Sequence, residues 1–219
     1  MARFGINDAD NYGNNGGSSF FSLKNDKDTA SVRFMYNGLE DVEGYAVHKV
    51  EIDGKTRYVN CIREYNEPRS KCPLCNSGNT QVVKLYVPLY DVDAGEIKLW
   101  ERGKKFFDKL SSICSRYVNG NTPLVAHTFD IERHGKAGDT QTTYEIYETG
   151  CDDTRLEDLP EVPDVLGRCI LSKTAEDMEF YNEEGYFPNN DGAPKREARE
   201  AREENQTGRR TPSRRGDNF

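Results

Sequence analysis

The chain has 219 residues, of which 35% are hydrophobic and 31% are charged, and its formal net charge at pH 7 is -8. This length suffices for one sizeable core with extensions, and the low hydrophobic share indicates that part of the chain lies outside any core. No stretch reaches the roughly 18 consecutive apolar residues of a membrane span, and the N-terminus lacks the basic and apolar regions of a signal peptide. We therefore expect a cytoplasmic protein with no membrane partner.

The charge is unevenly distributed along the chain. Residues 49–116 contain 13 Lys and Arg against 9 Asp and Glu, a local excess of +4, whereas residues 151–219 contain 11 against 17, or -6. A basic middle joined to an acidic C-terminal third is typical of a protein that binds polyanions and also carries a region that they repel.

The N-terminal half of the chain predicts an arm followed by strands. Residues 1–28 are rich in Asn, Asp, Gly and Ser and predict a flexible arm. Alternating apolar and polar residues, which are typical of strands, then recur in residues 31–36, 44–52, 56–61, 82–92 and 96–100. Turn signals at Asp53-Gly54 and Ala94-Gly95 predict that the second and third of these strands form one hairpin, and the last two another.

One amphipathic helix is predicted over residues 103–117, followed by a final hairpin. The apolar face of the helix comprises Phe106, Leu110, Ile113 and Tyr117. Residues 124–132 and 142–148 flank a turn-prone segment and should pair as two further strands. Several strands, one helix and a last hairpin predict a mainly β fold, an OB-type Greek-key barrel with one helix.

Four residues have the types and spacing of a metal site. Cys72 and Cys75 form a C-x2-C knuckle, whose two thiolates can reach one tetrahedral ion. Cys61 ends a predicted strand, and His48 lies in its hairpin partner, so the register could bring both beside the knuckle. One His and three Cys close a tetrahedral shell without a position for catalytic water, which predicts one structural Zn²⁺ held by His48, Cys61, Cys72 and Cys75.

Other interpretations of the cysteines and histidines remain open at this point. The C-x2-C pair is also found in redox motifs, and His127 or His134 could replace His48. Cys114, Cys151 and Cys169 are interpreted as core or incidental thiols.

The chain is accordingly expected to have four parts. They are a flexible N-terminal arm at 1–28, an OB-fold core at 29–150 with a zinc-binding ribbon subdomain inserted at about 45–82, an acidic, partly ordered extension at 151–187, and a disordered tail at 188–219. Within the extension, residues 165–178 could form a short helix that packs back.

The ligand spacing resembles that of a known family. His48, twelve residues, Cys61, ten residues, Cys72, two residues and Cys75 are similar to the zinc site of the bacteriophage T4 type single-stranded DNA-binding proteins, the gene 32 protein-like family. The Asp53-Gly54-Lys55 turn and the segment 103–109 at the start of the helix extend the resemblance. It covers residues 31–117, and at most to 148.

This resemblance implies an OB fold with a zinc subdomain and no enzymatic activity. It implies coating of single-stranded DNA in phage DNA replication, recombination and repair, in the cytoplasm of a bacterial host. The implied protein partners are further copies of the chain along DNA, and replication or recombination proteins bound by the C-terminal tail.

Single strands are bound by cations and by aromatic faces on which bases stack. Several cations here lie within two residues of an aromatic, and on a strand residues two apart share a face. The candidate DNA contacts are Arg33, Arg57, Tyr58, Lys84, Tyr86, Lys98, Trp100, Lys104 and Lys105. Large aromatics can equally fill the core of a small barrel, which is our interpretation of Phe34, Phe106 and Phe129 and is open for Tyr86 and Trp100.

Two other functions compete with DNA binding. A zinc-ribbon module could recruit replication proteins through its acidic tail. An enzyme would be a nuclease or a redox protein using Cys72 and Cys75, but the sequence contains no carboxylate cluster with two-metal spacing and no Ser or Cys nucleophile with a matched His.

Overall fold

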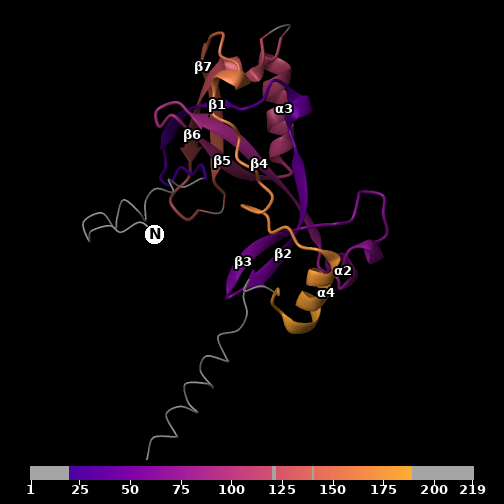
Figure 1. Cartoon of the computed structure of the whole chain (residues 1–219). Helices are drawn as coiled ribbons and strands as arrows, with labels where there is room; N and C mark the ends of the chain where they lie inside the picture. The colour runs from indigo at the N-terminus through magenta and orange to yellow at the C-terminus, as the bar shows by residue number, and fades with distance from the viewer. Residues whose placement is uncertain (1–19, 120–121, 140, 189–219) are drawn as a thin grey trace, which may run out of the picture. The chain divides into compact units, whose positions relative to one another are not determined.

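The computed structural model of the protein describes residues 20–119, 122–139 and 141–188 (Figure 1). The predicted tail at 188–219 and the first 19 residues of the predicted arm therefore lie outside the described residues, except for Pro188. No helix in the described ranges is both long and apolar enough to cross a membrane.

Seven strands form an open antiparallel sheet in the order β3-β2-β4-β1-β6-β7, with β5 paired to β4. The strands are β1 (Thr29–Phe34), β2 (Gly44–Ile52), β3 (Lys55–Asn60), β4 (Gln81–Asp91), β5 (Glu96–Gly103), β6 (His127–His134) and β7 (Thr143–Cys151). The predicted mainly β character is confirmed, and each predicted strand corresponds to one observed strand.

The described residues form three α-helices, where the sequence predicts one with a clear apolar period and a second, short one within residues 165–178. They are α2 (Pro73–Asn76), α3 (Phe106–Tyr117) and α4 (Ala175–Glu184), and four 3-10 turns lie at Leu39–Asp41, Arg69–Lys71, Leu124–Ala126 and Leu156–Asp158. The helix expected over 103–117 is α3. The sequence misses α2 because a four-residue helix shows no period, and it places the C-terminal helix about ten residues too early.

The chain divides into two compact units. The first comprises residues up to 47 and 82–169, and the second comprises 48–81 and the residues from 170 onward. β2 begins in the first unit and continues into the second.

A large aromatic and aliphatic core stabilises the first unit. Its fully buried members include Val32 and Phe34 of β1, Leu89 of β4, Leu110 of α3 and Phe129 of β6. Phe34 and Phe129 meet edge to face with ring centroids 5.3 Å apart. The predicted core role of these two rings is thereby confirmed.

The end of the predicted N-terminal arm is packed, which shortens the arm. The backbone N–H of Phe21 donates to the carbonyl oxygen of Leu99 at 2.9 Å, and the Phe21 ring is buried. Lys27 donates its backbone N–H to Arg133, and Arg133 donates its own to Asp28, at 2.8 and 2.9 Å. Residues 20–28 are therefore part of the first unit, because the apolar pair Phe20-Phe21 has a strand to cover.

The second unit is built from a hairpin, a knuckle and a C-terminal helix; β2, β3, α2 and α4 are grouped in Figure 1. The β2–β3 turn has positive φ at Asp53 (51°) and Gly54 (70°), as a two-residue hairpin turn with matching twist requires. The core of the second unit comprises Val50, Ile52, Val59, Cys72, Leu74, Cys75, Met178 and Phe187.

Residues from 170 onward complete the core of this second unit. Leu171 bridges β3 through two backbone hydrogen bonds, from Asn60 N–H at 3.1 Å and to Tyr58 at 2.9 Å. Met178 of α4 is fully buried, and Tyr181 stacks on Phe187 at 4.6 Å. Residues 170–187 of the extension predicted at 151–187 thus belong to the second unit.

Helix α4 starts at a capping box, which gives a testable stability effect. Thr174 Oγ1 accepts from Asp177 N–H at 3.2 Å, and Asp177 accepts from Thr174 N–H at 3.1 Å. We expect Thr174→Ala to lower the stability of α4 by about 1 kcal/mol, because one helical N–H loses its partner. Hydrogen exchange of the α4 amides measures this loss, and Thr174→Ser, which keeps the hydroxyl, should retain the wild-type protection. Equal protection in the alanine variant would show that the cap contributes nothing.

Candidate metal centre and candidate nucleic-acid groove

His48, Cys61, Cys72 and Cys75 lie together in the second unit and could hold a metal ion. The Nε2 atom of His48 is 3.4 Å from Cys72 Sγ and 3.5 Å from Cys75 Sγ, and the sulfurs of Cys61 and Cys75 are 3.7 Å apart. Ligand atoms about 2.0 to 2.3 Å from one tetrahedral ion would lie about 3.5 to 3.8 Å from one another. The four side chains thus have the spacing of one coordination shell.

Local structure explains how this sequence brings the four residues together. His48 is carried by β2, and Cys61 follows the last residue of β3, so the hairpin supplies both. Cys72 precedes α2, in which Pro73 occupies the first position, where a missing N–H costs nothing. The single turn of α2 then brings Cys75 back beside Cys72.

Polar neighbours fix the orientation of two ligands. His48 Nδ1 lies 3.4 Å from Asn79 Oδ1, and Asn79 Nδ2 donates to the carbonyl oxygen of Lys49 at 3.0 Å. Gln81 Nε2 donates to Cys61 Sγ at 2.7 Å. Such outer contacts hold an imidazole in one tautomer and stabilise charge on a ligating sulfur.

Burial gives the cluster the electrostatics of a cation site. His48 is 0% exposed, and burial lowers its pKa, so the imidazole is neutral and keeps a lone pair for a metal. Burial, together with the neighbouring Cys61 and Cys72 thiols, raises the pKa of Cys75 to about 11. Three adjacent sulfurs, of which those of Cys72 and Cys75 are buried, cannot all ionise without a nearby positive charge, and a divalent cation would supply it.

Trp100 belongs to the core of the first unit, which resolves its two interpretations. It is 3% exposed and makes edge contacts with the rings of Phe21, Phe106 and Tyr144 at 5.5, 4.8 and 5.1 Å. The guanidinium of Arg102 lies 4.7 Å from its ring centroid. The expected base-stacking role of Trp100 is therefore replaced by a packing role, because no ring face is open to a base.

Tyr86 is also buried among aromatic residues. Its ring centroid lies 6.1 Å from that of Tyr45 and 6.5 Å from that of Phe20. It lines a small cavity of about 320 Å³ together with Tyr36 and Tyr45. The structure thus assigns Tyr86 to packing as well.

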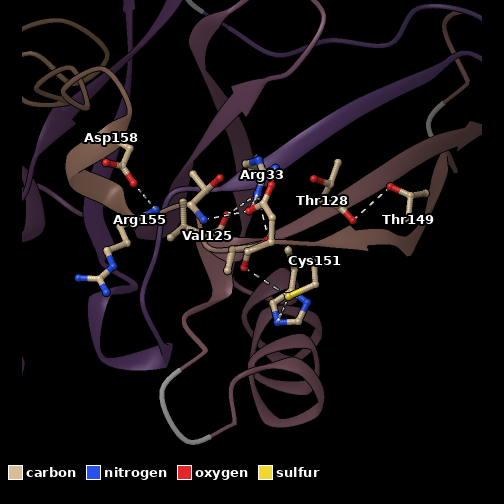
Figure 2. A network of polar contacts seen from close by, with 11 residues as sticks. Arg33, Val125, Thr128, Thr149, Cys151, Arg155 and Asp158 are labelled. Atoms are coloured by element: carbon tan, nitrogen blue, oxygen red, sulfur yellow. Dashed lines mark hydrogen bonds and ion pairs between the residues drawn. The ribbon is translucent and has the colours of Figure 1, made fainter.

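Arg33 is bound to the protein itself instead of presenting its charge to a phosphate. Its Nη1 donates to the carbonyl oxygens of Val125 and Ala126 at 3.1 and 2.9 Å, and its two terminal nitrogens bind both carboxylate oxygens of Asp152 at 3.0 and 2.6 Å (Figure 2). This bidentate pair holds the pKa of Asp152 well below its usual range. The arginine therefore has a structural role in place of the predicted DNA contact.

Lys84 and Lys98 form ion pairs across the β4–β5 hairpin. Lys84 Nζ is 2.6 Å from a carboxylate oxygen of Glu101, and Lys98 Nζ is 2.8 Å from Asp91 and 3.4 Å from Glu96. These carboxylates would compete with a phosphate for each lysine. Neither lysine is a strong candidate for DNA contact in this structure.

Arg57 and Tyr58 lie on β3 in the second unit. Arg57 is exposed and Tyr58 is half-buried. Their predicted contact with DNA stays a prediction.

Lys104 and Lys105 line a groove of about 550 Å³ in the first unit. Its other lining residues are Gly44, Val83, Leu85, Phe107 and Asp108. Both lysines are exposed, and within the described ranges neither has an ion pair. They stand at the N-terminus of α3, whose backbone dipole adds positive potential.

Phe107 is a groove residue that sequence reasoning missed. Its side chain is 40% exposed, whereas its neighbour Phe106 is buried in the core. The available signal was its position one residue off the apolar face of α3 and two residues after Lys105. An exposed aromatic beside two cations offers a stacking face and phosphate contacts together.

No protein-family model matches the chain, and no curated protein matches it.

Proposed function

We propose that this protein binds single-stranded DNA without sequence preference, through the groove lined by Lys104, Lys105 and Phe107. That groove is the observation that carries the proposal. Single-strand binding requires positive charge along the backbone and flat apolar faces for the bases, and the groove combines them.

Four of the lining residues have a distinct part in this proposal. The ammonium groups of Lys104 and Lys105 contact phosphates, aided by the N-terminus of α3. The exposed ring of Phe107 stacks on a base, and Val83 extends the apolar wall. Because stacking and phosphate contacts read no base edge, the binding is not sequence-specific.

The proposed metal is one structural Zn²⁺. Three sulfurs and one imidazole nitrogen are the ligands of closed tetrahedral zinc sites, and they leave no position for water. When bound, the ion supplies positive charge that keeps three thiolates together. His48, Cys61, Cys72 and Cys75 would hold it, and they thereby tie the β2–β3 hairpin to the α2 knuckle.

The proposed fold is of the OB type, which is often a partly open barrel that binds oligonucleotides on its surface. The antiparallel sheet and the resemblance in ligand spacing support it. On this basis the protein is a non-enzymatic component that protects single strands in phage DNA replication, recombination and repair. Its partners would be further copies along DNA and replication proteins that bind its C-terminal tail.

The stacking role of Phe107 is tested with two leucine variants. Phe107→Leu keeps apolar volume but removes the flat ring face, so we expect affinity for a fluorescent oligo-dT to fall about fivefold, the lower end of one stacking contact of roughly 1 kcal/mol. Fluorescence anisotropy at fixed salt measures it. Phe20→Leu is the matched control, since Phe20 is 37% exposed and lies outside the groove.

Two results would contradict the proposal. If affinity for oligo-dT falls equally in Phe107→Leu and Phe20→Leu, then Phe107 does not stack on a base in the groove. Absence of oligo-dT binding by the wild-type protein at low salt would reject DNA binding altogether and favour a zinc-ribbon module that recruits proteins.

A further inference from the structure

A second group of reactive side chains lies in the first unit, away from the groove residues in sequence. His127, Glu148 and Cys151 have ligating or reactive atoms within 4.8 Å of one another. His127 Nδ1 is 2.6 Å from Glu148 Oε1, and His127 Nε2 is 3.9 Å from Cys151 Sγ. The imidazole thus stands between a carboxylate on one nitrogen and a thiol on the other.

A β-bulge makes this arrangement. His127 pairs with Cys151 and Phe129 pairs with Glu148, with a register shift between Thr128 and Phe129. In a regular strand, residues 148 and 151 would point to opposite faces, because side chains alternate. The extra residue, Thr149, brings both to the side of His127, and its hydroxyl donates to the carbonyl oxygen of Thr128 at 3.2 Å (Figure 2).

The imidazole is held in one orientation. His127 is 7% exposed, and its ring centroid lies 5.5 Å from that of Tyr117 and 6.2 Å from that of Phe129. The Glu148 carboxylate accepts a hydrogen bond from the Nδ1–H group of His127, so the lone pair of Nε2 faces Cys151. Cys151 itself is exposed, so a reagent from solution can reach its sulfur.

We infer that Cys151 is an activated nucleophilic thiol, with His127 as its base and Glu148 as the residue that positions the base, and that peroxides oxidise it. His127 takes the thiol proton, and the resulting thiolate is paired with the imidazolium. The sulfur attacks one peroxide oxygen, an S–O bond forms and the O–O bond breaks. The leaving hydroxide takes the proton from His127, so that hydrogen peroxide and the thiol give a sulfenic acid and water.

The charges near Cys151 permit a thiolate there. The adjacent Asp152 would repel it, but its carboxylate is neutralised by the bidentate pair with Arg33 (Figure 2). A carboxylate oxygen of Glu148 lies within 4.8 Å of the sulfur and 2.6 Å from His127 Nδ1, so it stabilises positive charge on the imidazole more closely than it faces the thiolate.

The other five cysteines differ from Cys151 in exposure or partners. Cys61, Cys72 and Cys75 belong to the metal cluster. Cys114 is buried in the core and Cys169 is half-buried, and burial raises the pKa of both thiols. Cys151 is the exposed cysteine of the six.

The inference is tested by brief labelling of the full-length, metal-loaded protein with iodoacetamide, followed by peptide mass spectrometry. An ordinary thiol is only a few per cent ionised at pH 7, and full ionisation is partly offset by lower nucleophilicity. We expect Cys151 to react about fivefold faster in the wild type than in Glu148→Gln or His127→Gln.

A matched control is available on the same strand pair. Glu145 of β7 lies 3.5 Å from His134 Nε2 without a neighbouring cysteine, so Glu145→Gln should leave the Cys151 rate unchanged. Because His127 is buried, its variant could fold poorly, and the exposed Glu148 gives the cleaner test. Dilute hydrogen peroxide with dimedone should in addition trap sulfenic acid on Cys151 before any other cysteine.

Three outcomes would overturn the inference. They are labelling of Cys151 no faster than Cys169, a labelling rate unchanged by Glu148→Gln, and a metal content of two ions per chain that drops to one in Cys151→Ser. The last result would make Cys151 a metal ligand. None of these outcomes depends on DNA binding, so they test the inference separately from the proposed function.

Discussion

Substitution of Cys72 by Ser is expected to abolish metal binding and to unfold the second unit. The hydrophobic cluster of this unit contains eight buried side chains, and two of them are the candidate ligands Cys72 and Cys75. Structural zinc contributes an apparent binding free energy of roughly 10 to 16 kcal/mol near pH 7, more than so small a core can replace. Removal of one thiolate loses most of that binding free energy and leaves the ion with three protein ligands.

Metal analysis and hydrogen exchange measure this effect together. Zinc should fall from one ion per chain to none, and amides in residues 48–81 and 170–188 should lose protection while those of the first unit keep theirs. Cys169→Ser is the matched control, because Cys169 lies in the first unit outside the metal cluster. Persistent protection of the second unit after chelation of the wild-type protein would show that the ion is dispensable for its fold.

Replacement of both groove lysines, Lys104→Gln with Lys105→Gln, is expected to weaken oligo-dT binding about 25-fold at 0.1 M salt. Each phosphate contact on a single strand contributes a slope of roughly 0.7 in log affinity against log salt, so two contacts change the slope by about 1.4. If both proteins bind equally at about 1 M salt, this change of slope over one decade of salt gives a difference in affinity of about 25-fold at about 0.1 M salt. Titrations at several salt concentrations measure affinity and slope in one series.

The matched control changes the same charge elsewhere in the first unit. Lys24 and Lys136 are exposed and do not line the groove, so Lys24→Gln with Lys136→Gln should leave the slope nearly unchanged. If both double variants lose affinity equally, attraction depends on overall charge, and the groove is not the binding site.

Local patterns predicted much of the fold. Strict alternation in β2, the Asp53-Gly54 turn and the apolar period of α3 each depend on residues close in sequence, and all three agree with the structure. The grouping of the four metal ligands was accessible for the same reason, since a hairpin and a knuckle bring them together without distant contacts.

Features that depend on distant contacts were missed. Alternation places Trp100 on one side of β5, but it carries no information that Phe21 would cover that side. The ion pair of Arg33 with Asp152 likewise joins segments whose proximity only the fold defines. The ion pair of Lys84 with Glu101 lies within a predicted hairpin, but Glu101 falls one residue past the predicted strand 96–100. The bulge in β6–β7 escaped prediction because the residues that follow it, Thr149, Gly150 and Cys151, show no apolar alternation whose phase could reveal an extra residue. Without knowledge of the bulge, the sequence does not indicate that His127 lies beside Cys151.

The division of the second unit between residues 48–81 and 170–188 has a consequence for biosynthesis. A ribosome releases His48, Cys61, Cys72 and Cys75 long before it releases Met178 and Phe187, which close the core around them. During that interval the thiols are open to solvent and to metal donors, and they become enclosed only when the C-terminal segment emerges. For the same reason, a truncation at Cys151 removes more than a tail, because it leaves the metal unit permanently in this unfinished state.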